Sequence, residues 1–247
     1  MENMIKLCIF DLDDTLISTK ELYEERKHNA AHILKKMGFN YDEAYALQVE
    51  IDQEAILKDG VMDLNRFPNS FRTTYERLCE KYDLPYDSII GETLVHEGAQ
   101  VFQHHASVYP YTVSILEELN FRGYTANIIL TRGNKTIQLR RVLDANLADY
   151  FDNIFVVDYK TKDLLEKICS FYNVNPTEAV LIGDSMIGDI LPAMEAGLFG
   201  IYVPKGTSML DGGLQLTPTE ETFPSKLFIR NDLRDVPSVL KRIHLNG

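Results

Sequence analysis

Residues 5–15 read IKLCIFDLDDT. A largely apolar run, residues 5–10, is followed at once by Asp11, Asp13 and the hydroxyl of Thr15. Such a run is too short for a typical helix and does not alternate, which is typical of a parallel strand buried on both faces. The sequence therefore predicts a buried strand that ends in two carboxylates. One carboxylate can attack an electrophile while the other transfers a proton, and both can help to bind a divalent cation.

Similar short apolar runs recur along the chain, and amphipathic stretches separate them. The predicted strands are residues 5–10, 127–130, 154–157, 179–182, 200–203 and, more weakly, 227–230. The predicted helices between them are residues 113–120, 135–143, 162–171 and 192–196. This βαβ succession predicts an α/β fold, a Rossmann-like open parallel sheet with right-handed crossovers.

The segment between the first and the second strand follows a different pattern. It contains no convincing strand, and Gly and Pro residues punctuate its helical patterns over residues 21–37, 41–58, 67–82 and 89–105. We therefore expect an inserted all-α domain at residues 17–106. Residues 1–16 and 107–247 would together form the α/β core domain.

The overall composition disfavours several kinds of partner. The 247 residues carry a net charge of -12, so a nucleic-acid polymer or a membrane surface would be repelled on average. The three cysteines form no CxxC pair, which favours reduced thiols in a cytoplasmic protein. We expect no signal peptide and no membrane span, because no apolar run approaches roughly 18 residues. The composition does not indicate an oligomeric state.

Polar side chains follow four of the predicted strands. Asp11 and Asp13 follow the first, Thr131 ends the second, Lys160 comes after the third, and the loop GDSMIGD at residues 183–189 follows the fourth. Ligands of open α/β sheets bind beyond the carboxyl ends of the strands. We therefore expect these side chains to converge on one edge of the sheet.

This series of motifs resembles the haloacid dehalogenase-like superfamily, most of whose members are phosphohydrolases. The family's first motif is matched by Asp11, Asp13 and Thr15, its second by Thr131, its third by a lysine, and its fourth by residues 183–189. The resemblance covers the whole predicted core. The inserted helices resemble the family's helical cap of the first type, a lid that closes over the active site.

The resemblance implies a catalytic role for several residues. Asp11 would be the nucleophile that becomes an aspartyl-phosphate, and Asp13 would be the general acid and then the base. Thr131 would hydrogen-bond a phosphoryl oxygen, and Arg132 beside it is a second candidate for binding the phosphate. Lys160 would steady the nucleophile and the transferring group.

The resemblance also implies a Mg²⁺ site. The ion would be held by the Asp11 carboxylate, the Asp13 backbone carbonyl and Asp184, with Asp189 bound directly or through water. A hard ion that prefers oxygen ligands suits this set. A cation would also remove the repulsion between crowded carboxylates, which otherwise raises their pKa values.

Two assignments have alternatives in the sequence itself. Lys162 also lies near the third strand end, although the spacing favours Lys160 as the catalytic lysine. The first motif also resembles the start of a calcium-binding loop, but Leu16 stands where such a loop needs glycine, and a strand precedes it instead of a helix.

We therefore expect a Mg²⁺-dependent phosphatase that hydrolyses a small phosphorylated metabolite through an aspartyl-phosphate. Asp13 disfavours the dehalogenase branch of the family, which lacks this acid, and the phosphonate-cleaving branch, which replaces it with a small residue. One alternative is a phosphomutase similar to the β-phosphoglucomutase branch, in which a sugar hydroxyl replaces water as the acceptor. Another is a binding or regulatory protein that keeps the fold without turnover.

Overall fold

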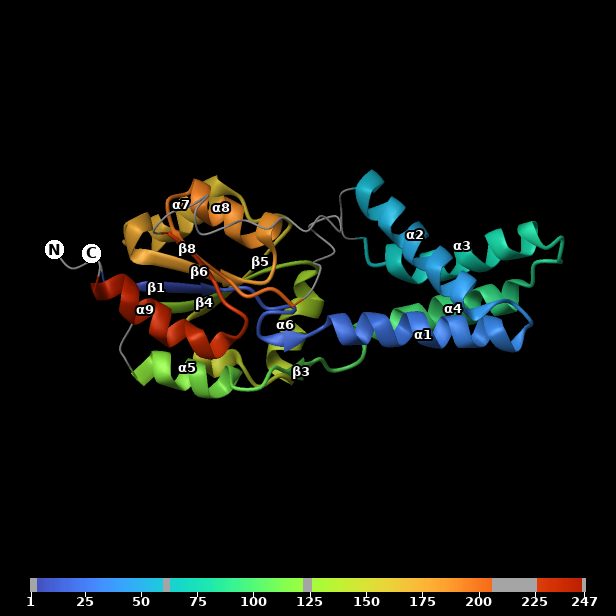
Figure 1. Cartoon of the computed structure of the whole chain (residues 1–247), viewed down its shortest axis with the longest axis horizontal. Helices are drawn as coiled ribbons and strands as arrows, with labels where there is room; N and C mark the ends of the chain where they lie inside the picture. Colours follow the sequence, from blue (N-terminus) through green and yellow to red (C-terminus); the bar gives the residue numbers. More distant parts are fainter. Residues whose placement is uncertain (1–3, 60–62, 122–125, 206–225, 246–247) are drawn as a thin grey trace. The chain divides into compact units, whose positions relative to one another are not determined.

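The computed structural model describes residues 4–59, 63–121, 126–205 and 226–245. The chain divides into two compact units, one formed by Met1–Ser18 with Ala106–Gly247 and the other by Thr19–His105. The first unit contains a β-sheet with helices, and the described residues of the second contain helices and no strand (Figure 1). Within the described ranges, no helix is both long and apolar enough to cross a membrane.

The first unit is built on a six-stranded sheet. Its strands are β1 (Leu7–Phe10), β4 (Ala126–Arg132), β5 (Asn153–Val157), β6 (Ala179–Gly183), β7 (Phe199–Tyr202) and β8 (Leu227–Ile229). They pair in the order β5-β4-β1-β6-β7-β8, and every pairing is parallel. The predicted open parallel α/β sheet is therefore confirmed. β1 lies in the interior of the sheet, so its carboxyl end is flanked by β4 on one side and β6 on the other.

Helices cover both faces of this sheet. They are α5 (Thr112–Phe121), α6 (Lys135–Asp144), α7 (Lys162–Phe171), α8 (Leu191–Glu195) and α9 (Val236–Leu245). Cys8 and Phe10 of β1 share a core with α5 and α9, whereas Leu7 and Ile9 share a core with α7 and α8 on the opposite face (Figure 1). Because successive strand side chains point to opposite faces, burial on both sides requires the continuous apolar run seen in the sequence.

Some elements of the first unit depart from the sequence prediction. α9 is not among the predicted helices, although its buried residues follow helical spacing: Val236, Val239, Leu240 and Ile243. Ile17–Ser18 forms a short strand, β2, which pairs antiparallel with β3 (Ser107–Val108). Two-residue strands carry too little pattern to be recognised.

The second unit consists of α1 (Lys20–Lys36), α2 (Tyr41–Asp59), α3 (Arg66–Lys81) and α4 (Ser88–Ala99). A stripe on α3 anchors its core, because Phe67, Phe71, Tyr75 and Leu78 recur at helical spacing and are buried. The prediction that the last helix reaches residue 105 is wrong. α4 ends at Ala99 and tightens into a 3₁₀ turn, Gln100–Phe102, as helix ends often do.

Candidate active site

The chain makes a tight turn immediately after β1. The carbonyl of Leu12 accepts a hydrogen bond from the amide of Leu16 at 2.9 Å. Asp14 takes a φ of 58°, a left-handed conformation that Asp adopts more readily than most residues. The turn brings Thr15 back to Asp11, and its Oγ1 donates to Asp11 Oδ2 at 3.0 Å. The first carboxylate of the motif is therefore fixed through one of its two oxygens.

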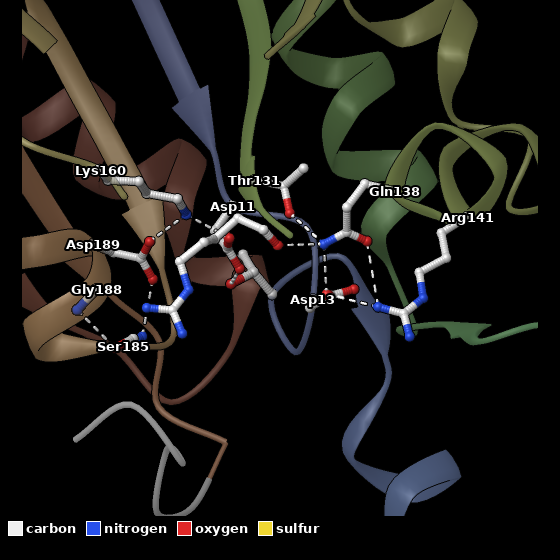
Figure 2. A network of polar contacts seen from close by, with 11 residues as sticks. Asp11, Asp13, Thr131, Gln138, Arg141, Lys160, Ser185, Gly188 and Asp189 are labelled. Atoms are coloured by element: carbon white, nitrogen blue, oxygen red, sulfur yellow. Dashed lines mark hydrogen bonds and ion pairs between the residues drawn. The ribbon is translucent and has the colours of Figure 1, made fainter. Parts of the chain in front are cut away.

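Lys160 binds the other oxygen of Asp11. Its Nζ lies 2.5 Å from Asp11 Oδ1 and forms a second ion pair with Asp189 Oδ1 (Figure 2). All three side chains are buried. Lys162, in contrast, is exposed on the first turn of α7 and lies 3.8 Å from Glu166. Of the two candidate lysines, the structure brings only Lys160 to the nucleophile candidate.

The loop after β6 fixes Asp189 from the opposite side. It forms a π-helical turn, Met186–Ile190, a geometry that is frequent at functional sites. The Ser185 amide donates to Asp189 Oδ2 at 3.1 Å, and Ser185 Oγ accepts from the Gly188 amide at 2.9 Å (Figure 2). Gly183 makes room for this carboxylate, because a Cβ at that position would lie 2.4 Å from Asp189 Oδ2.

Three carboxylates and one ammonium thus gather at the ends of β1, β5 and β6. We call Asp11, Asp184, Asp189 and Lys160 the acid cluster. One carboxylate oxygen from each of the three aspartates lies within 4.8 Å of those of the other two. With all four groups ionised, the cluster carries two surplus negative charges.

Burial and mutual repulsion shift the pKa values of the acid cluster. Burial raises the pKa of Asp11 to about 7; Lys160 opposes this rise and Asp189 adds to it. Burial, followed by the charges of Asp11 and Asp189, raises the pKa of Asp184 to about 9. Burial alone would lower the pKa of Lys160, but the adjacent carboxylates outweigh it and raise that pKa. Such a set of hard oxygen donors with surplus negative charge fits a divalent cation such as Mg²⁺.

A second network lies beside the acid cluster. Gln138 Nε2 is 2.8 Å from Asp13 Oδ2 and 2.9 Å from Thr131 Oγ1, and Arg141 Nη1 is 2.8 Å from the same Asp13 oxygen (Figure 2). We call Asp13, Thr131, Gln138 and Arg141 the Gln138 network. Its side chains come from three places: the turn after β1, the end of β4, and the buried face of α6. Asp13 is not one of the three clustered carboxylates, and the predicted metal ligand at this position is its backbone carbonyl.

Gln138 and Arg141 were missed by sequence reasoning. A signal was present, because they lie three residues apart on one helix face together with the buried Val142. Polar side chains inside an apolar stripe indicate a specific partner. Arg132 was predicted to bind phosphate, and the structure places its guanidinium over the Tyr159 ring, 5.6 Å from the centroid.

Comparison with known proteins gives consistent results. A family model described as haloacid dehalogenase-like hydrolase matches residues 5–197. A glyceraldehyde 3-phosphate phosphatase of Pyrococcus abyssi is 26% identical over 214 residues, which cover 82% of this chain and 83% of that protein. Pyrophosphatase PpaX of Bacillus thuringiensis is 21% identical over 209 residues, covering 78% of this chain and 80% of that protein.

The solved structures show the same fold. A haloacid dehalogenase-like family hydrolase from Xanthomonas campestris superposes with a TM-score of 0.75 at 19% identity, covering 98% of this chain and 93% of that chain. At this identity, the likeness concerns the fold alone.

Proposed function

The chain belongs to the haloacid dehalogenase-like hydrolase family, and from this premise we propose that it is a phosphatase acting on a small phosphorylated metabolite. The observation that carries the proposal is the environment of Asp11. Its carboxylate is buried at the end of β1, with Lys160 on one oxygen and Thr15 on the other. This arrangement supports a nucleophile held in a single orientation, beside positive charge that favours its attack on an anionic ester.

Asp11 would attack the phosphorus atom in line. The new bond joins an Asp11 oxygen to phosphorus, and the ester bond from phosphorus to the leaving oxygen breaks. Asp13 would protonate that oxygen as it leaves, because an alkoxide is a poor leaving group. The products of this half-reaction are the free alcohol and an aspartyl-phosphate on Asp11.

Water would complete the reaction. Asp13, now a carboxylate, takes a proton from the water as the water attacks phosphorus. The bond between Asp11 and phosphorus breaks, inorganic phosphate leaves, and both carboxyl groups return to their starting states. Lys160 and Thr131 would hold the phosphoryl oxygens through both steps, since positioned donors supply most of the catalysis in phosphoryl transfer.

Mg²⁺ is the cofactor that the acid cluster suits best. Asp11, Asp184 and Asp189 would hold it, together with the Asp13 carbonyl. When bound, it supplies positive charge opposite the phosphoryl oxygens and offsets the surplus charge of the aspartates. The helical unit, residues 19–105, would serve as the cap that selects the substrate. Relatives named for glyceraldehyde 3-phosphate and for pyrophosphate support a small phosphorylated substrate.

A phosphate-release screen tests the proposal. The purified chain is incubated with Mg²⁺ and a panel of phosphorylated compounds that includes glyceraldehyde 3-phosphate, pyrophosphate and sugar phosphates, and kcat/KM is compared. We expect inorganic phosphate release that EDTA abolishes and Mg²⁺ restores. An isomerised sugar phosphate without phosphate release would indicate a mutase instead. Tight binding of one ester without any turnover would indicate a binding protein.

A further inference from the structure

We propose that Gln138 is a positioning residue that orients both the proton-transferring Asp13 and the phosphate-binding hydroxyl of Thr131. This inference rests on the proposed phosphatase function and adds a residue to it. Gln138 does not touch the reacting atoms in this scheme. It acts through the two side chains that do.

The contacts of Gln138 fix the orientation of its amide. Nε2 lies within hydrogen-bond distance of three acceptors: Asp13 Oδ2 at 2.8 Å, Thr131 Oγ1 at 2.9 Å and the Arg132 carbonyl at 2.7 Å. Oε1 accepts from Arg141 Nη1 at 3.3 Å. Reversing the amide would bring its oxygen against the Asp13 carboxylate and the Arg132 carbonyl, neither of which has a hydrogen to donate. Nε2 therefore faces Asp13, Thr131 and the Arg132 carbonyl with two hydrogens, one of which is shared between two of these acceptors.

The first consequence concerns the two carboxylate oxygens of Asp13. Oδ2 already accepts from Gln138 and from Arg141, at 2.8 Å each, and two incoming hydrogens leave no room for a third. Oδ1 is buried and has no hydrogen-bond partner within the part of the chain that the structure describes. The contacts therefore assign Oδ2 to the network and leave Oδ1 as the Asp13 oxygen that would serve the leaving group and the water.

The second consequence concerns Thr131. Its Oγ1 accepts a hydrogen from Gln138, and the side chain is buried at the end of β4. The hydroxyl hydrogen must then point away from Gln138. A phosphoryl oxygen is an acceptor without hydrogens of its own, so it suits a hydroxyl that is oriented to donate.

The local backbone holds Gln138 in place. The Asn134 side chain caps α6 by accepting from the amides of Thr136 and Ile137, which fixes the first turn of the helix. Gly133 has a φ of 139°, and a Cβ there would lie 3.2 Å from Gln138 Nε2. Glycine therefore supplies both the backbone conformation and the space that the amide needs.

The leaving group provides a test that separates positioning from general structural support. The variant Gln138→Met keeps the length of the side chain and removes its hydrogen bonds. Two substrates are compared: glyceraldehyde 3-phosphate, whose alkoxide needs a proton, and p-nitrophenyl phosphate, whose phenolate leaves without one. The parameter is kcat/KM, which covers phosphoryl transfer to Asp11. Arg140→Met is the matched control, because Arg140 lies on the same helix with an exposed side chain.

We expect Gln138→Met to lower kcat/KM about 10²-fold for the alkyl ester and about tenfold for the aryl ester, because general acid catalysis contributes about 10²–10⁴-fold. The ratio of the two values should thus fall about tenfold, whereas Arg140→Met leaves both unchanged. An equal fall for both esters, or no fall, overturns the proposal. If Gln138→Met does not fold, Gln138→Glu replaces it, since its carboxylate keeps the shape and offers no donor.

A crystal structure of each form distinguishes failure of this inference from failure of the proposed function. If the wild-type chain releases phosphate from no compound of the panel, the phosphatase assignment fails, and the side-chain positions still decide the role of Gln138. An Asp13 carboxylate that turns away in Gln138→Met supports positioning. An Asp13 carboxylate and a Thr131 hydroxyl that stay in place in the variant overturn it.

Discussion

The acid cluster of the α/β unit and the Asp52–Arg66 ion pair of the helical unit differ in how far their buried charges balance. In the helical unit, Asp52 pairs with Arg66, so one anion meets one cation. In the acid cluster there are three aspartates and one lysine, which forms ion pairs with two of them, Asp11 and Asp189. Burial raises the pKa of Asp52, and Arg66 and Lys27 oppose that rise. At Asp11 the opposing Lys160 is accompanied by Asp189, which raises the pKa further.

The difference separates structural charge from functional charge. A buried pair of one anion and one cation has no net charge, so no further ion is required to neutralise it. A buried group with surplus negative charge is costly to the fold and becomes favourable when a cation binds. The acid cluster is therefore suited to bind a cation, whereas the Asp52–Arg66 pair is suited to a structural role.

The largest expected effect comes from removing the proposed nucleophile, Asp11. Asp11→Asn should lower the rate of phosphate release at least about 10⁴-fold, because an amide is a poor nucleophile and nucleophile deletions in other enzymes cost this much or more. Asp149→Asn, an equivalent change at an exposed position, is the control and should keep wild-type rates. Measurable phosphatase activity near the wild-type level in Asp11→Asn would remove Asp11 from the mechanism.

Breaking the Asp52–Arg66 ion pair should lower the unfolding free energy and leave the chemistry of the acid cluster unchanged. Arg66→Met leaves the Asp52 carboxylate buried without its partner, so we expect a loss of about 3–5 kcal/mol in unfolding free energy. Urea titration followed by circular dichroism measures it. Adding Asp52→Leu to Arg66→Met should restore most of the loss, since a neutral pair has no unpaired charge. Arg77→Met removes an exposed ion pair with Glu54 and should change stability by less than about 1 kcal/mol.

The sequence predicted residues of the acid cluster, but it did not predict the Asp52–Arg66 pair. Asp11, Thr131, Lys160 and Asp184 were predicted as site residues because each lies at or after the end of a short apolar run, and parallel strands bring their carboxyl ends to one edge. Asp52 and Arg66 lie on different helices, and no local pattern states that two helices will bring them together. Long-range pairing between helix faces is decided by packing.

The same limit explains why the sequence did not predict the helix residues of the Gln138 network. Gln138 and Arg141 lie on an amphipathic helix, and whether a polar residue points inward depends on how that helix rotates on the sheet. The choice between Lys160 and Lys162 had the same origin, because residues so close in sequence differ mainly in side-chain direction. In the structure, Lys160 is buried against Asp11 and Lys162 is exposed, and Gln138 and Arg141 are both buried.

A smaller effect should follow from disturbing the geometry of the acid cluster while leaving its charges intact. Gly183→Ala introduces a Cβ 2.4 Å from Asp189 Oδ2, which forces this buried carboxylate to move. Overpacking of this kind costs about 1–3 kcal/mol. We expect a lower melting temperature and weaker Mg²⁺ binding by calorimetry. Unchanged Mg²⁺ affinity would argue that Asp189 is not a ligand.

The smallest expected effect is the change in unfolding free energy per pH unit. It should distinguish the acid cluster from the Asp52–Arg66 pair. The ordinary pKa of Asp is 3.8, and in the folded chain the pKa is about 7 for Asp11 and about 9 for Asp184. Between the ordinary pKa and these raised values, Asp11 and Asp184 keep their protons in the folded chain and have lost them in the unfolded chain. Unfolding releases them, so stability falls as pH rises from about 5 to about 9, by about 1.4 kcal/mol per pH unit for each such proton.

Bound Mg²⁺ should flatten this slope, because cation binding displaces the same protons from the carboxylates. In EDTA the melting temperature should fall by about 3–5 °C per pH unit for one proton, and in excess Mg²⁺ by much less. Asp184→Asn should flatten the slope in EDTA, whereas Asp52→Asn, in the helical unit, should keep the difference between EDTA and Mg²⁺. Equal slopes with and without Mg²⁺ in the wild-type chain would mean that the surplus charge of the acid cluster is not neutralised by a divalent cation.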